Sequence, residues 1–224
     1  MLRGSTGPLG RAAAAAVAGL LLIVLLWPTT PTASGTSIGD VLRVLAKAEN
    51  VHIAKTQRND TQPFEELWIA RRAGLFARKL AREYVLCDLD RRRKIVIDRQ
   101  TAATRTVEMS RSECNSARQF ITDSLANTLA QVTPGTKLHP ARNDGAGEIR
   151  HEVDVYEVSV GRDQDRRAPV LRTYIDRRTG LPRKTEYFHH HPHSHERYLQ
   201  TTTVFTYLAE PDMNDAIRAM FPTP

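Results

Sequence analysis

The strongest constraint on the fold is a run of six short strand-like segments between residues 51 and 109. Each is rich in β-branched and aromatic residues, and the dividers between them, such as Asn59-Asp60 and Ala73-Gly74, carry turn chemistry. Parallel strands need a crossover of roughly a dozen residues or more, and no divider is that long. The run therefore predicts an antiparallel meander, with strands at 51–58, 64–72, 75–84, 85–89, 94–98 and 104–109.

Four further strand-like segments follow, at 149–160, 168–176, 181–188 and 198–208. In the first of them the apolar residues change parity between Val155 and Tyr156, which predicts a β-bulge there.

Helical patterns occupy residues 37–50, 116–131 and 211–221, where apolar residues recur at three- and four-residue spacing. The prediction is an α+β fold with a large, curved or partly closed antiparallel sheet of about ten strands, packed on two or three helices.

The N-terminal region predicts export. Ala12–Trp27 holds sixteen residues without a charge, and Arg3 and Arg11 precede it. At about 1.5 Å per residue it would span about 24 Å, near the lower limit for a membrane-spanning helix. A cleaved signal peptide has the same layout, with a candidate cleavage site near Gly35.

Both readings keep the basic N-terminus in the cytoplasm and place the rest outside it. We therefore expect a cytoplasmic segment at 1–11, a transmembrane anchor or signal peptide at 12–27 and a linker at 28–37. Residues 38–224 would form one extracytoplasmic, periplasmic domain.

The formal net charge of +7 would suggest nucleic acid as the partner of a cytosolic protein. Export makes that partner unexpected, and the basic residues gather at predicted turns such as Arg71-Arg72 and Arg91–Arg93. These arginines are either solvated turn residues or contacts for anionic lipid. Cys87 and Cys114 could form one disulfide or remain free, and the sequence leaves both open.

Enzymatic signatures are missing from the sequence. It contains no G-x-S-x-G, H-E-x-x-H, Walker or Rossmann pattern. We expect neither catalysis nor a cofactor.

Residues 171–188 predict a hairpin. Asp176 is placed to accept hydrogen bonds from turn amides, and Gly180 can take the positive φ that such turns need. Pro182 is acceptable as the first residue of a strand. Asp176, Gly180 and Pro182 are therefore structural residues.

The same hairpin carries a resemblance. Tyr174–Lys184, "YIDRRTGLPRK", and residues 66–69, "ELWI", resemble segments of the LolA/LolB/RseB-like superfamily of bacterial envelope proteins. The order of elements is similar over roughly Ile38–Phe221. The resemblance implies an unclosed β-barrel wrapped on helices, with a hydrophobic cavity for acyl chains or a lipidated partner.

Several predicted strands offer apolar residues on both faces, which indicates either a lined concavity or a sheet covered by helices on both sides. For the concavity, the candidate ligand-binding residues are Leu67, Trp68, Ile69, Phe76, Leu80, Ile95, Ile97 and Tyr174. Arg91, Arg92 and Arg93 would hold an anionic headgroup. The leading hypothesis is a non-enzymatic, membrane-tethered envelope module that binds lipid, acyl chains or a lipidated protein. The alternative is a protein-interaction or signalling domain of the sigma-regulator type on the same fold.

Five histidines surround Pro192. In an extended segment His189, His191, His193 and His195 would share one face and could chelate Zn²⁺, Cu²⁺ or Ni²⁺, so a His-rich metal-binding protein is a second alternative. A proline-broken hairpin tip seldom offers the rigid frame of a physiological site. A solvated loop is the preferred interpretation, and a pH-sensitive electrostatic element is a further alternative.

Overall fold

The computed structural model of the chain describes residues 37–129, 138–141, 152–160, 168–192, 194 and 196–221, with the backbone alone for 121–129. Its helices are α2 (Ile38–Leu45), α3 (Arg111–Leu129) and α4 (Glu210–Met220). Its strands are β1 (Asn50–Gln57), β2 (Glu65–Ala70), β3 (Leu75–Leu80), β4 (Glu83–Asp88), β5 (Arg93–Asp98), β6 (Thr104–Glu108), β7 (His139–Pro140), β8 (Val153–Ser159), β9 (Val170–Asp176), β10 (Pro182–His190) and β11 (Arg197–Tyr207).

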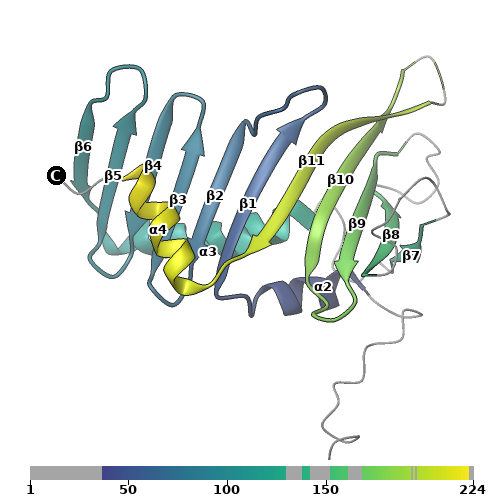
Figure 1. Cartoon of the computed structure of the whole chain (residues 1–224), viewed down its shortest axis with the longest axis horizontal. Coiled ribbons are helices and arrows are strands. Elements are labelled where there is room, and N and C mark those ends of the chain that lie inside the picture. Colours follow the sequence, from purple (N-terminus) through teal and green to yellow (C-terminus); the bar gives the residue numbers. More distant parts are fainter. Residues whose placement is uncertain are drawn as a thin grey trace, which may run out of the picture. The chain divides into compact units, whose positions relative to one another are not determined.

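All eleven strands belong to one antiparallel sheet, in the order β6-β5-β4-β3-β2-β1-β11-β10-β9-β8-β7 (Figure 1). The pairing of β1 with β11, from Val51 opposite Tyr207 to Gln57 opposite Thr201, joins the first meander to the later strands. The two ends of the order, β6 and β7, do not pair with each other, so the curled sheet stays open. The prediction of an α+β fold with a large unclosed antiparallel sheet on helices is confirmed.

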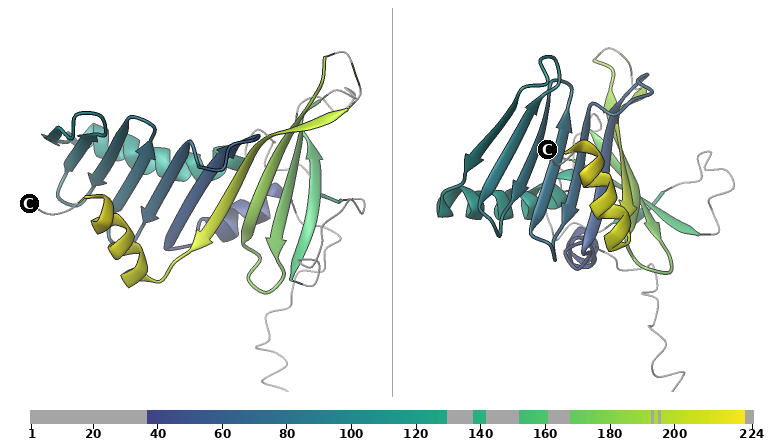
Figure 2. Two further views of the ribbon diagram at one scale, coloured as in Figure 1. Left: turned by 45° about the horizontal axis from the view of Figure 1, so that its top comes forward. Right: turned by 60° about the vertical axis from the view of Figure 1, so that its left-hand side comes forward.

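Helices cover both faces of the first meander. In Figure 2, α4 lies on one side of the sheet, and α2 and α3 lie on the other. The alternation of side chains along β2 shows why both are needed. Leu67 and Ile69 join the core under α2 and α3, whereas Trp68 and Ala70 join a second core under α4.

α2 begins with a capping box. The Ser37 hydroxyl accepts a hydrogen bond from the Asp40 amide, and the Asp40 carboxylate accepts one from the Ser37 amide. Ile38, Val41 and Leu45 then face the sheet and are fully buried. α3 begins five residues earlier than predicted, because Ser110 and Glu113 form a second capping pair.

The hairpin prediction is confirmed. The Asp176 carboxylate accepts hydrogen bonds from the amides of Arg178 and Thr179, at 2.9 and 2.8 Å. Gly180 has φ +70°, and Pro182 opens β10. Arg183 also donates to Asp176, so the turn carries an ion pair as well.

Two details differ from the sequence-based expectations. The predicted bulge at Val155–Tyr156 is wrong, because β8 pairs with β9 in continuous register from Val153 to Ser159. Register shifts lie instead in β10, between Tyr187 and Phe188 and between Pro182 and Lys184. The two-residue strand β7 lies in a segment for which no strand was predicted, because its pairing with β8 depends on tertiary contact.

Among the residues described, no helix combines the length and apolar character that a membrane span requires. The predicted segment at 12–27 and the linker at 28–37 lie outside the described residues, apart from Ser37.

Candidate functional site

A groove of about 510 Å³ lies between α4 and the outer strands of the first meander. Its floor is apolar because every second residue of β3, β4 and β5 faces this side of the sheet. Leu75, Leu86, Ile95 and Ile97 form that floor, and all four are only half-buried. Ile217 and Phe221 form the wall on α4, and Thr104 and Thr106 form the far side on β6.

The groove exists because α4 covers only part of its side of the sheet. Met213, Ile217 and Phe221 face the sheet and close over Trp68 and Ala77. Met213 is fully buried, and the Phe221 ring meets the Tyr84 ring edge-on, with centroids 6.3 Å apart. Figure 1 shows that α4 crosses this face of the sheet over β3 and β4 and leaves β5 and β6 without a helix over them.

The rim of the groove is basic. Arg91, Arg93 and Arg218 line it and are exposed, against the single carboxylate of Asp88. The Arg91 amide donates to Asp88 at 2.9 Å, which fixes the β4–β5 turn, while the Arg91 guanidinium lies 3.6 Å from the same carboxylate. Exposed arginines beside an apolar floor suit a ligand with an apolar chain and an anionic end.

The structure brings only part of the predicted site together. Ile95 and Ile97 line the groove, and Arg91 and Arg93 lie on its rim. Arg92 does not line the groove, because its guanidinium pairs with Glu108 at 2.8 Å.

Four of the predicted apolar ligand residues face the opposite side of the sheet. Leu67, Ile69 and Phe76 belong to the core under α2 and α3. Leu80 shares their side of the sheet because it lies four residues after Phe76 in β3. Trp68 faces the groove side, but it is only 7% exposed and packs under α4.

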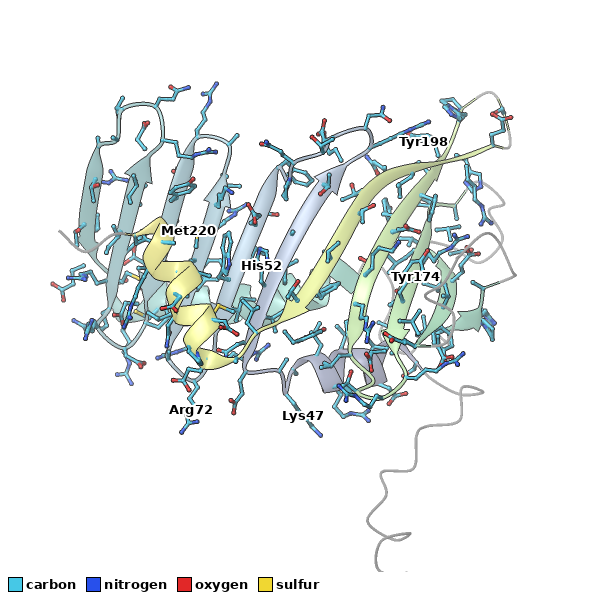
Figure 3. The ribbon with its side chains drawn as sticks, viewed as in Figure 1. Lys47, His52, Arg72, Tyr174, Tyr198 and Met220 are labelled. Carbon is cyan, nitrogen blue, oxygen red and sulfur yellow. The ribbon has the colours of Figure 1, made fainter. Side chains whose placement is uncertain are left out.

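Tyr174 lies in the other half of the sheet, on β9, far from α4 in Figure 3. Its hydroxyl donates to Glu186 at 2.8 Å, and the Lys184 ammonium lies 4.2 Å from its ring centre while pairing with the same carboxylate. Burial, and next the Glu186 carboxylate, raise the pKa of Tyr174. It belongs to a polar network and not to the groove.

Two of the three described histidines of the hairpin tip pack against tyrosines. His189 and His191 both contact the Tyr198 ring, with centroids 6.1 and 4.7 Å apart. His193 and His195 lie outside the described residues. Across the described ranges, no cluster of three or more His, Cys, Asp or Glu side chains could hold a metal ion.

Sequence reasoning missed Leu75, Leu86, Ile217, Arg218 and Phe221. The apolar stripe of the last helix was visible in the sequence, but its place over β2 and β3 depends on the return of the chain from β11. No local signal specifies that placement.

Comparison with known proteins gives little. No protein-family model matches the sequence, and no curated protein matches it. Among solved structures, the chain is similar to one in "The complex structure of Pseudomonas aeruginosa MucA/MucB", with a TM-score of 0.38 and 17% sequence identity. The match covers 79% of this chain and 60% of that one. A likeness this weak carries no argument about family or function.

Proposed function

We propose that the chain is a non-enzymatic binding module that takes the acyl chain of a lipid or lipidated protein into the α4 groove. One observation carries the proposal: the half-buried floor of Leu86, Ile95 and Ile97 continues past α4, with arginines along its rim. The resemblance of residues 66–69 and 174–184 to the LolA/LolB/RseB-like family supports the same ligand class.

The magnitudes suit this ligand. A volume of about 510 Å³ lies within the range of roughly 300–1,000 Å³ that is usual for small-ligand sites. Each buried methylene contributes about 0.8 kcal/mol, so ten would contribute roughly 8 kcal/mol before the cost of ordering the ligand. A charge-assisted hydrogen bond from a rim arginine would add to this and orient the anionic end.

A fluorescent fatty acid tests the proposal. Purified residues 37–224 should raise its fluorescence, and Ile95→Glu should abolish the rise because a carboxylate on the floor repels both the chain and the anionic end. Circular dichroism and thermal unfolding would show that the variant still folds.

Val107→Glu is the matched control. Val107 lies on the neighbouring strand β6, is 42% exposed and faces the opposite side of the sheet. The Val107→Glu variant should bind the probe like the parent chain. Equal binding by parent and Ile95→Glu would contradict the proposal.

Tethering and export remain part of this proposal. The support is the uncharged run Ala12–Trp27 with Arg3 and Arg11 before it. A reporter enzyme fused after Pro224 should be active only outside the cytoplasm. N-terminal sequencing of the mature protein distinguishes a retained anchor from cleavage near Gly35.

A second candidate is protein interaction at the β6 edge. All five residues of β6 are exposed, and β6 ends the strand order of the described sheet. An extended partner segment could pair with this edge. A partner that is captured by the parent chain and by Ile95→Glu, but lost in Val107→Lys, would favour this function over acyl binding.

A further inference from the structure

A second, smaller cavity of about 270 Å³ lies beside the groove, at the turn between β2 and β3. Three arginines line it: Arg71 and Arg72 from the turn and Arg118 from α3. Asp90 contributes a carboxylate to the cavity, and Leu75 lines both this cavity and the groove. Figure 3 shows Arg72 at this edge of the sheet.

The backbone around this cavity is fixed by hydrogen bonds. The Arg71 amide donates to the Glu49 carbonyl at 2.8 Å, and the Gly74 amide donates to the Arg71 carbonyl at 3.1 Å. The Leu89 amide then donates to the Gly74 carbonyl at 2.9 Å, which ties the β2–β3 turn to the end of β4. The backbone around the cavity is therefore held in place without a ligand.

Arg71 carries a buried hydrogen-bond donor that lacks an acceptor among the described residues. Its Nε is fully buried and has no hydrogen-bond partner within the described residues. Burial also lowers the pKa of this guanidinium, which means that its charge is poorly solvated. A buried donor without an acceptor is costly, and an anion beside this guanidinium would offset its poorly solvated charge.

The charges in the cavity indicate which anion fits. Three guanidinium groups face one carboxylate, and that carboxylate lies 4.0 Å from Arg118. The guanidinium groups therefore outnumber the carboxylates among the described residues that line the cavity, which favours an anion. Planar guanidinium forks bind the oxygens of a tetrahedral phosphate in a bidentate way.

We infer that the cavity formed by Arg71, Arg72 and Arg118 binds a phosphate group. The group could be free phosphate or the phosphate end of a lipid whose chain occupies the groove. The lipid alternative rests on the proposed acyl-binding function. In that case the acyl chain would lie in the groove and the phosphate in the cavity, with Leu75, which lines both, between them. Binding of free phosphate does not depend on that function.

Calorimetric titration of the full chain in a zwitterionic detergent tests the site, first with inorganic phosphate. Arg71→Gln should weaken binding about tenfold or more, as expected for the loss of one charge-assisted hydrogen bond. Arg72→Gln, an exposed change, tests the site even where Arg71→Gln does not fold. Arg105→Gln is the matched control, because Arg105 is exposed on β6 and does not line the cavity.

Asp90→Asn gives a readout that a merely structural role would not give. Removal of the carboxylate that Asp90 contributes to the cavity should tighten phosphate binding and steepen its dependence on salt. Absence of phosphate binding by the parent chain would overturn the inference. So would equal weakening by Arg71→Gln, Arg72→Gln and Arg105→Gln.

Short-chain phosphatidic acid distinguishes the two sources. If the phosphate is a lipid headgroup, this lipid should bind more tightly than inorganic phosphate, and Ile95→Glu should remove only the gain. If the two bind equally, the source is free phosphate. Phosphate binding that is lost in Arg71→Gln, in a protein that ignores the acyl probe, would support this inference and reject the proposed acyl-binding function.

Discussion

The imidazole ring of His52 lies flat on the indole ring of Trp68, with ring centroids 4.5 Å apart and planes 17° from parallel. His52 Nε2 also lies 3.1 Å from a Glu66 carboxylate oxygen, and Lys79 pairs with the other oxygen of that carboxylate. Trp68 in turn packs under Met213 and Ile217 of α4. A titratable group is thus linked through one aromatic ring to the helix that walls the groove.

The first prediction is that His52 makes the fold less stable in acid. Burial lowers the pKa of His52 and outweighs the attraction of Glu66, which acts in the opposite direction. Because the unfolded pKa of about 6.5 is then higher than the folded one, the unfolded chain binds more protons in this range. The stability that neutral His52 contributes is fully present above the unfolded pKa of about 6.5 and is lost as the pH falls through the folded pKa.

Urea unfolding at pH 7.5 and pH 5.0 measures this effect. His52→Gln should lose less stability between the two pH values than the parent chain. Some loss should remain in the variant, because carboxylates and other histidines contribute to the pH dependence of both proteins. An unchanged difference between the two pH values would contradict the role given to His52.

A second prediction concerns α4. Met213 is fully buried beside Trp68 and Ala77, so Met213→Ala leaves a cavity and should lower the unfolding free energy by about 2–5 kcal/mol. Val204→Ala, on a 42% exposed side chain, should change it by less than about 0.5 kcal/mol. Equal effects of the two changes in urea unfolding would show that α4 is not docked on the sheet.

Much of the sheet could be predicted from the sequence because its signals are local. The turn residues at Ala73-Gly74 and Asp176–Gly180 set strand boundaries, and Gly74 and Gly180 both take positive φ as turn glycines do. Short dividers then force the antiparallel order. Ten of the eleven strands in the described sheet follow from these signals.

The site was less predictable because alternation shows that both faces of a strand are apolar, but not what covers each face. Leu67 and Trp68 are equally apolar neighbours in the sequence, and yet they lie in different cores. Ile95 and Ile97 line the groove only because the core under α4 leaves them half-buried, which is a tertiary relationship. Arg91, Arg92 and Arg93 were identified from the sequence as binding candidates. Arg92 pairs with Glu108 instead and does not line the groove.

The two turn glycines give a third prediction. Gly74 has φ +60° and Gly180 has φ +70°, so alanine at either position should cost about 1–2 kcal/mol from backbone strain alone. A Cβ atom at Gly74 would also lie 2.8 Å from the Asp90 carboxylate, whereas at Gly180 its nearest neighbour, Val44, is 3.9 Å away. Gly74→Ala should therefore be the more destabilising change in thermal unfolding.

Asp90→Ala provides the control for that comparison. It removes the clash, so the double variant Gly74→Ala/Asp90→Ala should recover the part of the loss that exceeds the cost of Gly180→Ala. No coupling between positions 74 and 90 would show that the turn relaxes away from the contact.

Asp176 gives a fourth prediction. Burial acts to raise its pKa, but hydrogen bonds from the Thr179 amide and the Arg183 guanidinium outweigh this and lower it. Asp176→Ala removes the acceptor of the turn amides and of the Arg183 guanidinium and should cost about 1–3 kcal/mol. Asp176→Asn keeps an acceptor for the turn amides and should cost less. Asp154→Ala, which breaks a partly exposed pair with Arg177, should cost at most about 1 kcal/mol.

The last prediction concerns Cys87 on β4 and Cys114 on α3. Both thiols are free and buried in the core under α2 and α3. Burial raises the pKa of the Cys87 thiol, so little of the reactive thiolate is present at neutral pH. A thiol reagent should label neither cysteine in the folded chain and should label both once the chain is unfolded in denaturant without reductant. Labelling of neither under denaturing conditions would show that the two sulfur atoms form a disulfide in the exported protein.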